Sequence, residues 1–207
     1  MKQHYIVGID EVGRGPLAGP VTVAAVMLPA TWRMRHAQWG NRRIPLRDSK
    51  RLSAAHREVW FRHIKTNSLV ACAVSHVTPR VIDRINISRA ANLAATRALR
   101  RLATSRWPLA TRVKVFLDGG LFADTSSLVA SGYRLVAHTI IRGDEKYAAI
   151  KLASIIAKVR RDRYMTKKHK AFPQYGFAAH KGYGTKAHYR ALRKHGPSPL
   201  HRLTFLH

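Results

Sequence analysis

Apolar positions along the chain fall into short blocks that are separated by loops of glycine, proline and polar residues. Residues 5–9 and 21–28 are two such blocks, and the glycine- and proline-rich stretch 13–20 connects them. Short apolar runs bounded by turn residues are typical of strands, so this region predicts a strand, a structured loop and a second strand. Residues 30–47 have no clear period and are predicted to form a surface loop.

Helical spacing begins after this loop. Ser53 is placed to act as the N-cap of a helix that continues to about residue 65. Within 88–102, and again from about residue 147, apolar residues recur three and four positions apart, which predicts helices that pack one face on a sheet. The other predicted elements are strands at 69–77, 113–117 and 135–141 and short helices at 78–85 and 186–194.

This order of elements predicts the fold class. Three strands, a helical stretch and then strand, strand and helix indicate an α/β domain with a mixed β-sheet flanked by helices, followed by a small C-terminal helical segment. The 207 residues fit one domain and are enough to bury a substantial core.

Charge changes the picture more than length does. Lysine and arginine number 38 against 10 aspartate and glutamate residues, a formal net charge of +28. Such an excess attracts phosphate backbones and predicts salt-sensitive binding to polynucleotides. Solubility or attraction to an anionic membrane surface would account for the same excess, so charge alone does not separate an enzyme from a packaging protein.

Several classes of protein are disfavoured. No apolar run approaches the roughly 18 residues of a membrane span, and the first residues lack the apolar stretch of a secretory signal. The single cysteine, Cys72, cannot form an internal disulfide, which is compatible with a cytoplasmic location. The histidines and the cysteine do not follow zinc-ligand spacing, so no zinc is expected.

Carboxylates stand where predicted strands end. Asp10 and Glu11 follow the first strand, Asp118 closes the strand at 113–117, and Asp144 follows the next one. If the first and fourth strands are parallel neighbours, their carboxylates meet at one sheet edge, where hard oxygen ligands favour Mg²⁺ or Mn²⁺. Taken singly, each has an alternative, because such residues also cap helices and turns. The remaining acidic residues have no such placement and are expected to be structural or solvated: Asp48, Glu58, Asp83, Asp124, Glu145 and Asp162.

The residues after Glu11 form a second candidate element. Gly13, Arg14 and Gly15 match neither a Walker A loop nor a dinucleotide fingerprint. Two glycines around a basic side chain permit close approach of backbone amides to a sugar-phosphate unit. The alternative is a tight connection between two strands.

Together these stretches resemble the signatures of the ribonuclease HII family, in order and over most of the chain. The resemblance rests on IDEVGRGPLAGPV at 9–21, DSKRLS at 48–53, IDRINI at 82–87, LDG at 117–119, GD at 143–144, ASIIAKVRRD at 153–162, HKGYGT at 180–185 and GPSPLHR at 196–202.

The resemblance implies a ribonuclease H-like catalytic domain at 1–170 and a C-terminal substrate-contacting segment at 171–207 packed on it. It implies an endonuclease that cleaves the RNA strand of RNA–DNA hybrids and cuts 5′ to single ribonucleotides embedded in duplex DNA. Two-metal hydrolysis would leave 3′-hydroxyl and 5′-phosphate ends. The implied catalytic residues and ligands of two Mg²⁺ or Mn²⁺ ions are Asp10, Glu11, Asp118 and Asp144.

Substrate contacts are implied for further residues. Gly13, Arg14 and Gly15 match the element that senses the ribose 2′-hydroxyl, with Tyr183 packing at that sugar. From the residues alone, a tyrosine between two glycines also serves to anchor a chain terminus on the core. The other implied contacts, to flanking phosphates, are those of Ser49, Lys50, Ser154 and Lys158, the last two of which also suit a role in supporting the acidic cluster. His201 and Arg202 are further candidates for substrate contact.

One departure from the family pattern concerns the predicted helix that begins near residue 147. Lys151 and Leu152 replace small residues, and we expect a charged and a larger side chain to crowd the neighbourhood of the acidic cluster.

Two other functions stay open: a catalytically inactive, basic nucleic-acid-binding protein of the same fold, and a nuclease of this fold with another substrate. The expected partner is an RNA–DNA hybrid or ribonucleotide-containing DNA, without a membrane. The chain is expected to be monomeric, and a replication-clamp partner is undetermined.

Overall fold

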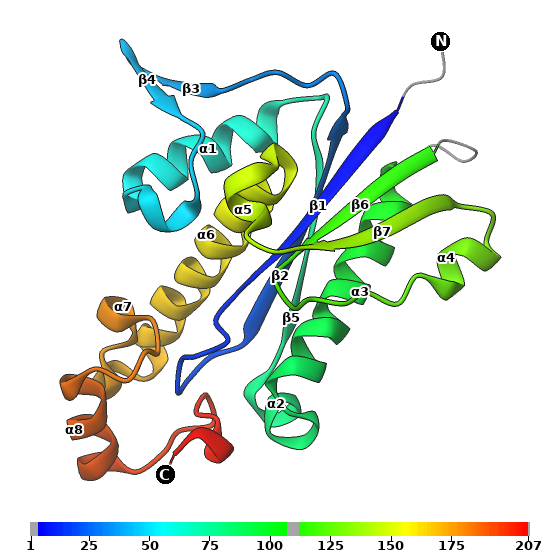
Figure 1. Cartoon of the computed structure of the whole chain (residues 1–207). Coiled ribbons are helices and arrows are strands. Elements are labelled where there is room, and N and C mark those ends of the chain that lie inside the picture. Colours follow the sequence, from blue (N-terminus) through cyan, green and yellow to red (C-terminus); the bar gives the residue numbers. More distant parts are fainter. Residues whose placement is uncertain (1–3, 107–111, 207) are drawn as a thin grey trace.

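The computed structural model describes residues 4–106 and 112–206. The expected absence of an apolar leader rests on residues that include 1–3, which lie outside this range. Within the described residues, the main sheet has five strands in the order β5-β2-β1-β6-β7 (Figure 1). These strands are β1 (Tyr5–Val12), β2 (Val21–Pro29), β5 (Ala71–Val77), β6 (Arg112–Asp118) and β7 (Arg134–Ile140).

The sheet is mixed, as the order of elements predicts. β1 pairs antiparallel with β2 and parallel with β6, and β7 extends the parallel half. β2 is buried along its whole length because it lies inside the sheet with helices over both faces. Its unbroken apolar sequence follows from this position, since a strand covered on both faces needs no alternation.

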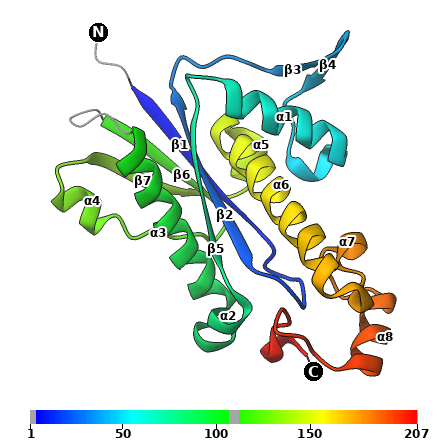
Figure 2. The ribbon, with the colours of Figure 1, turned by 180° about the vertical axis from the view of Figure 1, so that it is seen from behind.

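Helices cover the two faces separately. The α3 helix (Ile87–Arg106) packs on one face and the long α6 helix (Ala148–Ala171) on the other, as Figures 1 and 2 show from opposite sides. Each face has its own hydrophobic cluster, and α1 (Ala54–Thr66) packs outside α6. The Ser53 hydroxyl accepts a hydrogen bond from the His56 amide at 3.2 Å, which confirms the predicted N-cap.

α6 can approach β1 closely because the strand carries a glycine at the crossing. A Cβ atom on Gly8 would lie 2.2 Å from the carbonyl carbon of Ala149 and 2.3 Å from the amide nitrogen of Ile150. Real Cβ atoms do not approach backbone this closely, so any side chain at this position would push the start of α6 away from the sheet. Residue 8 therefore sets the distance between the helix and the strand that ends in the carboxylates.

Residues 30–47 are not a simple loop, which corrects the prediction. They contain a hairpin of β3 (His36–Trp39) and β4 (Arg42–Pro45). Only Ala37 and Ile44 are fully buried among these eight residues. One apolar side chain per strand is too little for a detectable alternation, and the burial comes from tertiary packing on α1.

The remaining helices are short. α2 (Pro79–Ile85) was predicted, whereas α4 (Ser126–Ala130), α5 (Gly143–Lys146) and α7 (Phe177–His180) were not, because four or five residues are too few for a periodic pattern.

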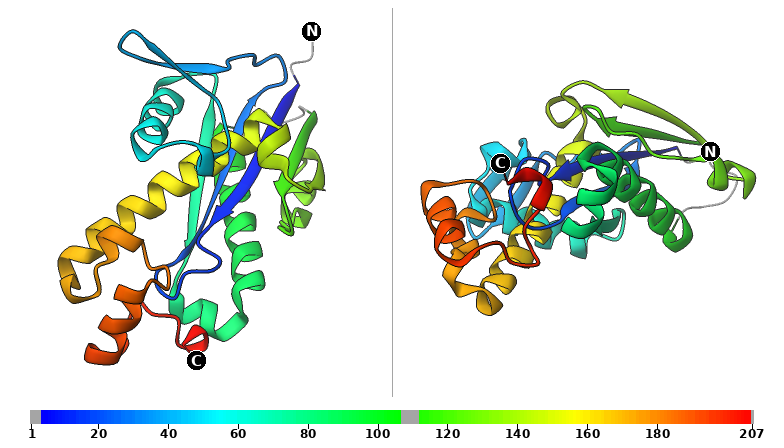
Figure 3. Two further views of the ribbon diagram at one scale, coloured as in Figure 1. Left: turned by 60° about the vertical axis from the view of Figure 1, so that its left-hand side comes forward. Right: turned by 90° about the horizontal axis from the view of Figure 1, so that it is seen from below.

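The chain then folds back on its own beginning. α8 (Lys186–His195) and the residues after it bring the C-terminal segment beside the loop between β1 and β2 (Figure 3). Backbone hydrogen bonds join the two regions, from Gly19 to the Leu200 carbonyl at 2.8 Å and from Arg202 to the Leu17 carbonyl at 2.8 Å. No helix in the described part of the chain is long and apolar enough to cross a membrane.

Candidate active site

The parallel pairing of β1 with β6 brings two carboxylates together. Ile9 is in register with Leu117, so Asp10 and Asp118 follow at the same edge of the sheet. This confirms the predicted neighbourhood of the two strands. Asp10 lies on the face covered by α6, since Ile9 belongs to the cluster under α3 and successive strand residues alternate between faces.

Asp118 also positions the third carboxylate. Its Oδ1 accepts hydrogen bonds from the backbone amides of Gly143 at 2.6 Å and Asp144 at 3.4 Å. The carboxylate therefore holds the start of α5, and Asp144 in its first turn is drawn to the same edge. A glycine at 143 suits this close approach, because a Cβ would lie 2.4 Å from Ile150 Cδ1 and 3.1 Å from Asp118 Oδ1, so the Ile150 side chain would have to move.

Burial and mutual repulsion disfavour negative charge in this cluster. Burial, and then the charge of Glu11, raise the pKa of Asp10 well above its usual range, while a hydrogen bond from Ser154 opposes the shift. Burial also raises the pKa of Asp144, with Asp118 as the next cause. Carboxylates that destabilise one another in this way are stabilised by a bound cation.

Glu11 has one carboxylate oxygen that accepts no hydrogen bond within the protein. Burial raises the pKa of Glu11; Arg14, whose Nη1 lies 3.5 Å from Glu11 Oε1, opposes this shift, and Asp118 adds to it. The second oxygen, Oε2, is buried and has no hydrogen-bond partner. A buried carboxylate oxygen without a partner costs free energy unless a cation or a water molecule satisfies it.

These features fit a divalent metal ion. Within the described residues, no three histidine, cysteine, aspartate or glutamate side chains already surround a common point as ligands. Without a cation between them, the negatively charged carboxylates are expected to repel one another and to lie further apart. The raised pKa values of Asp10, Glu11 and Asp144 each include a contribution from a neighbouring carboxylate. The donor set is all oxygen, which suits Mg²⁺ or Mn²⁺ rather than zinc.

A lysine borders the cluster. Lys50 Nζ lies 3.7 Å from Asp144 Oδ2, and the Lys50 side chain is largely exposed. Burial acts to lower the pKa of Lys50, but the carboxylates of Asp48, Asp144, Asp10 and Asp118 outweigh it and raise the pKa. The ammonium group therefore stays protonated beside the acidic edge, where it can meet a phosphate.

Two serines join the lysine turn to α6. The hydroxyl groups of Ser49 and Ser154 are 2.8 Å apart and buried. Because Ser154 also hydrogen-bonds Asp10, this pair ties the 3₁₀ turn at Ser49–Arg51 to the carboxylates.

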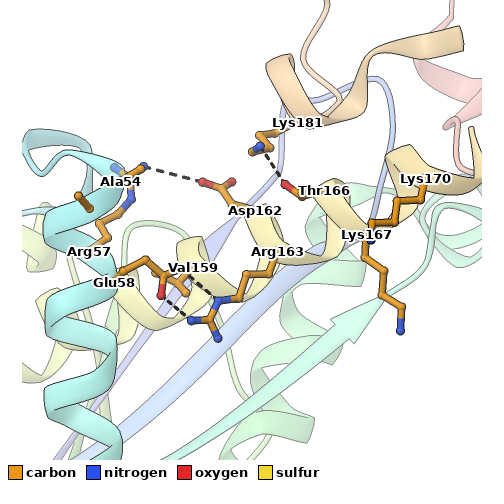
Figure 4. Close-up of a pocket in the computed structure, with 11 residues that line it drawn as sticks. Ala54, Arg57, Glu58, Val159, Asp162, Arg163, Thr166, Lys167, Lys170 and Lys181 are labelled. Atoms are coloured by element: carbon orange, nitrogen blue, oxygen red, sulfur yellow. Dashed lines mark hydrogen bonds and ion pairs between the residues drawn. The ribbon is translucent and has the colours of Figure 1, made fainter. Parts of the chain in front are cut away.

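Lys158 is the predicted site residue that the structure separates from this group. Its Nζ donates to Asp162 Oδ1 at 2.9 Å, and Asp162 Oδ2 lies 3.8 Å from Arg57 Nη2. Figure 4 shows Asp162 between α6 and α1, turned toward Arg57. Arg57 in turn donates to the carbonyls of Ser49 and Leu52. Lys158 therefore shares the Asp162 carboxylate with Arg57, and Arg57 is the side chain that anchors the Ser49 turn.

Two buried arginines, Arg161 and Arg202, hold the loop after β1. Arg202 donates to the carbonyls of Gly13 at 2.5 Å, Arg14 at 2.7 Å and Gly19 at 2.9 and 3.0 Å. Arg161 donates to three further carbonyls, those of Ala18, Pro20 and Lys181, at 2.9–3.1 Å. Burial, and then Arg161, lower the pKa of Arg202 to about 9, so the guanidinium remains a cation at neutral pH.

Tyr183 belongs to this assembly. Its side chain is 44% exposed, so it does not anchor the terminus by burial. The Arg161 guanidinium lies over the Tyr183 ring, 5.9 Å from its centroid. Arg161 also packs against Gly13, where a Cβ would lie 2.3 Å from the Arg161 Nε. Arg161 therefore connects Gly13 with Tyr183, and Gly15 beside them is exposed and open.

The structure corrects the expectation for His201 and Arg202. Both are buried, His201 at 3% exposure and Arg202 at 0%, so neither side chain faces a substrate. His201 Nε2 contacts His188 Nε2 at 2.9 Å, and His188 Nδ1 lies 2.9 Å from the Tyr183 carbonyl. These residues support the loop that carries Tyr183. A sequence signal for Arg161 existed, since it falls on the same helical face as the buried Ala157 and Met165.

The two departures from the family pattern, at 151 and 152, lie in different environments. Leu152 is fully buried in the cluster under α6. Lys151 is half-buried and lines a pocket beside Trp32 and Lys146.

A basic α/β protein with buried carboxylates converging on the edge of a mixed sheet has the features of a metal-dependent nuclease. The model of the family described as Ribonuclease HII matches residues 7–207, and the chain belongs to this family. It is accordingly a metal-dependent endoribonuclease, of a family that cleaves the RNA strand of RNA–DNA hybrids.

Individual comparisons agree. A Ribonuclease HII from Endomicrobium trichonymphae is 43% identical over 202 residues, covering 98% of this chain and 85% of that protein. The crystal structure of ribonuclease H2 from Pyrococcus horikoshii has a TM-score of 0.72 at 26% identity, covering 97% and 93% of the two chains. A structure of the PCNA:RNase HII complex from Archaeoglobus fulgidus has a TM-score of 0.62 at 25% identity, covering 96% and 93%. The predicted ribonuclease H-like fold is confirmed.

Proposed function

We propose that this ribonuclease cuts on the 5′ side of single ribonucleotides embedded in duplex DNA as well as within continuous RNA–DNA hybrids. The observation that carries the metal-dependent part is the convergence of Asp10, Glu11, Asp118 and Asp144, with one buried Glu11 oxygen left unpartnered. We assign these four residues as ligands of two divalent ions, Mg²⁺ or Mn²⁺.

Bound ions would activate water and stabilise the leaving 3′-oxygen, giving 3′-hydroxyl and 5′-phosphate ends. The chain's own residues prepare this reaction. Asp118 holds the start of α5 through two amide hydrogen bonds and so keeps Asp144 at the edge. Ser154, with Ser49, fixes the Asp10 carboxylate, and Lys50 offers a protonated ammonium group to a flanking phosphate.

Recognition of the ribonucleotide falls to the loop after β1. Arg202 donates to the carbonyls of Gly13 and Arg14 from the protein interior. The solvent-facing side of the loop is therefore available to the substrate. Gly15 is exposed with open space around it, and Tyr183 is exposed beside Arg161. A ribose 2′-hydroxyl can both donate and accept a hydrogen bond, and it is the group that distinguishes RNA from DNA.

The division into a catalytic part (1–170) and a substrate-contacting segment (171–207) belongs to the same proposal, because Tyr183 lies in the second part. We assign a monomeric state and a cytoplasmic location. PCNA binding is a property of the Archaeoglobus fulgidus protein, and for this chain a clamp partner stays undetermined.

A sequencing-gel assay on duplex DNA containing one ribonucleotide, with Mg²⁺, Mn²⁺ or chelator, tests the proposal. A metal-dependent cut 5′ to the ribonucleotide is expected. Cleavage of a continuous hybrid without this cut would reject the junction activity. Binding without any cleavage would favour the alternative of an inactive nucleic-acid-binding protein.

A further inference from the structure

The segment between β2 and the Ser49 turn has a composition that the active site does not explain. Residues 30–47 include no aspartate or glutamate. They contain one histidine and five arginines, which are Arg33, Arg35, Arg42, Arg43 and Arg47. Figure 1 shows the β3–β4 hairpin of this segment standing out from the body of the protein, beyond α1.

A pocket of about 670 Å³ lies under the first part of this segment. Trp32, Arg33 and Arg35 line one side, and Lys146 and Lys151 line the other. Its lining includes no acidic residue. Among the described residues, these four cations form no ion pair, so no carboxylate neutralises them. Arg33 Nη1 donates to the carbonyls of Ala30 and Trp32, which fixes the guanidinium without cancelling its charge.

The cleft in Figure 4 provides a contrast. It also lies beside α6 and is lined by several cations, but two of them are matched by carboxylates. Arg163 makes a two-pronged contact with Glu58, and Arg57 lies 3.8 Å from Asp162. Part of the positive charge in that cleft is therefore paired with carboxylates, whereas none of the four cations in the pocket under residues 32–36 is.

Two segments of the chain link the pocket to the active site. Lys146 is in the same short helix as Asp144, and Leu46 in the pocket wall leads directly into the turn that carries Lys50. Figure 1 shows the hairpin near the start of α6 and the loop after β1 near its far end. A nucleic acid crossing the carboxylates would extend from one toward the other.

The pocket is held in shape before any ligand arrives. Ala37 and Ile44 of the hairpin are buried, the Leu46 amide donates to the Arg35 carbonyl at 2.8 Å, and Trp60 Nε1 donates to the Pro45 carbonyl at 3.4 Å. A binding surface that is already ordered loses little conformational entropy on association. Trp32 Nε1 is buried without a hydrogen-bond partner, which leaves one donor in the pocket wall unsatisfied.

We propose that this pocket, with the arginines of residues 30–47, binds the sugar-phosphate backbone of the substrate flank that extends from the scissile bond away from Tyr183. Clustered arginine and lysine without acidic neighbours are suited to phosphate oxygens. The inference rests on the proposed function for the position of the scissile bond, but the binding it describes does not depend on catalysis. It also gives Lys151, the departure from the family pattern, a role outside the carboxylate cluster.

The test compares two double variants with the same charge change. Arg35→Gln/Lys151→Gln removes two charges from the pocket, and Lys65→Gln/Arg97→Gln removes two exposed charges from α1 and α3. Binding to a ribonucleotide-containing duplex is measured by fluorescence anisotropy in chelator across a salt series. The pocket variant should bind about tenfold more weakly near physiological salt, with a salt slope lower by about 2, since each lost phosphate contact removes roughly 0.9. The control variant should stay close to wild type.

A flank-length series locates the contact. Shortening the duplex on the pocket side should weaken wild-type binding by a similar factor and leave the pocket variant almost unchanged, whereas shortening the other side should affect both equally. Equal losses in the two double variants, or the same length dependence in wild type and pocket variant, would overturn the proposal. A failure to cut at a single ribonucleotide would contradict the proposed function and leave this binding comparison intact.

Discussion

The carboxylate edge and the buried arginines are two concentrations of charge that the protein treats in opposite ways. Arg161 and Arg202 are fully buried, yet their guanidinium groups are surrounded by backbone carbonyls. Asp10 and Asp144 are also buried, but their surroundings raise the pKa of both groups. Buried charge is tolerated where hydrogen bonds satisfy it and is costly where they do not.

The difference separates two functions within a single site. The arginines complete their hydrogen bonds inside the protein and fix the shape of the loop after β1. The carboxylates lack such a full set of partners: the pKa values of Asp10, Glu11 and Asp144 are raised, and one buried Glu11 oxygen has no hydrogen-bond partner in the chain. The loop held by the two arginines is therefore rigid, whereas the carboxylate edge is suited to bind a cation.

The largest expected effect comes from removing one ligand at the acidic edge. Asp10→Asn should lower the cleavage rate on the order of 1000-fold, because a metal ligand is lost, while hybrid binding stays within a few-fold. Thermal stability without metal should not fall, since one of the repelling charges is gone. Turnover on a labelled hybrid, anisotropy and thermal melts measure these quantities.

Asp124→Asn is the matched control, because Asp124 lies on the surface and pairs with Arg100. It should leave turnover unchanged. Near-normal turnover of Asp10→Asn would contradict the assignment of this residue as a metal ligand.

A substitution at the buried arginines should lower the stability of the protein. Arg202→Met removes the donors that satisfy the carbonyls of Gly13, Arg14 and Gly19. Leaving buried acceptors unpaired costs about 1–3 kcal/mol each, part of which the loop can recover by moving toward water, so we expect the free energy of unfolding to fall by about 3 kcal/mol. Urea denaturation measures it.

The exposed Arg193 on α8 offers a control, since Arg193→Met should change the same quantity by less than about 0.5 kcal/mol. An Arg202→Met protein as stable as wild type would show that the carbonyls do not depend on this arginine.

Acid should weaken the C-terminal segment through His201. Burial, and then the charge of His188, lower the pKa of His201 to about 4, so the folded protein holds this ring neutral while the unfolded chain protonates it near 6.5. The unfolded state therefore binds more protons between these values, and stability falls as the pH drops through this window. Between pH 7 and pH 5 the loss should be about 1–2 kcal/mol.

Denaturation of wild type and His201→Asn at both pH values measures this loss. The variant should lose less stability on acidification, whereas replacement of the exposed His195 should leave the pH dependence as it is. An identical pH dependence in wild type and His201→Asn would exclude this residue as its source.

The smallest expected effect is that of replacing the exposed Tyr183, which tests its role in substrate contact. Tyr183→Ala should reduce kcat/KM at an isolated ribonucleotide by about tenfold, because an aromatic contact worth roughly 1–3 kcal/mol is lost. Cleavage of a continuous hybrid should fall less, since many ribonucleotides offer productive positions. Equal losses on both substrates, or unchanged kinetics, would point to a role in packing instead. Tyr189→Ala, at another exposed tyrosine nearby in sequence, is the control.

Much of this arrangement could be predicted from the sequence, because strong local patterns coincide with the elements that carry it. The apolar run of β6 predicted the strand end at which Asp118 lies, and the period of α6 predicted a helix packed on the sheet, whereas Ser154 was implied only by the family resemblance. The hairpin at residues 30–47 could not be predicted, since only Ala37 and Ile44 are buried and their environment comes from α1. The inward direction of Arg202 could not be predicted either, because its partners are carbonyls that any sequence would provide.

The pairing of β1 with β6 also has a consequence for how the protein is made. Asp10 leaves the ribosome more than a hundred residues before Asp118, and Asp144 follows later still. The pairing of β1 with β6 cannot form until α1, α2 and α3 have been synthesised, because β6 follows these helices in the chain. A growing chain therefore displays its basic surface to cellular nucleic acids well before it can assemble the centre that would cut them.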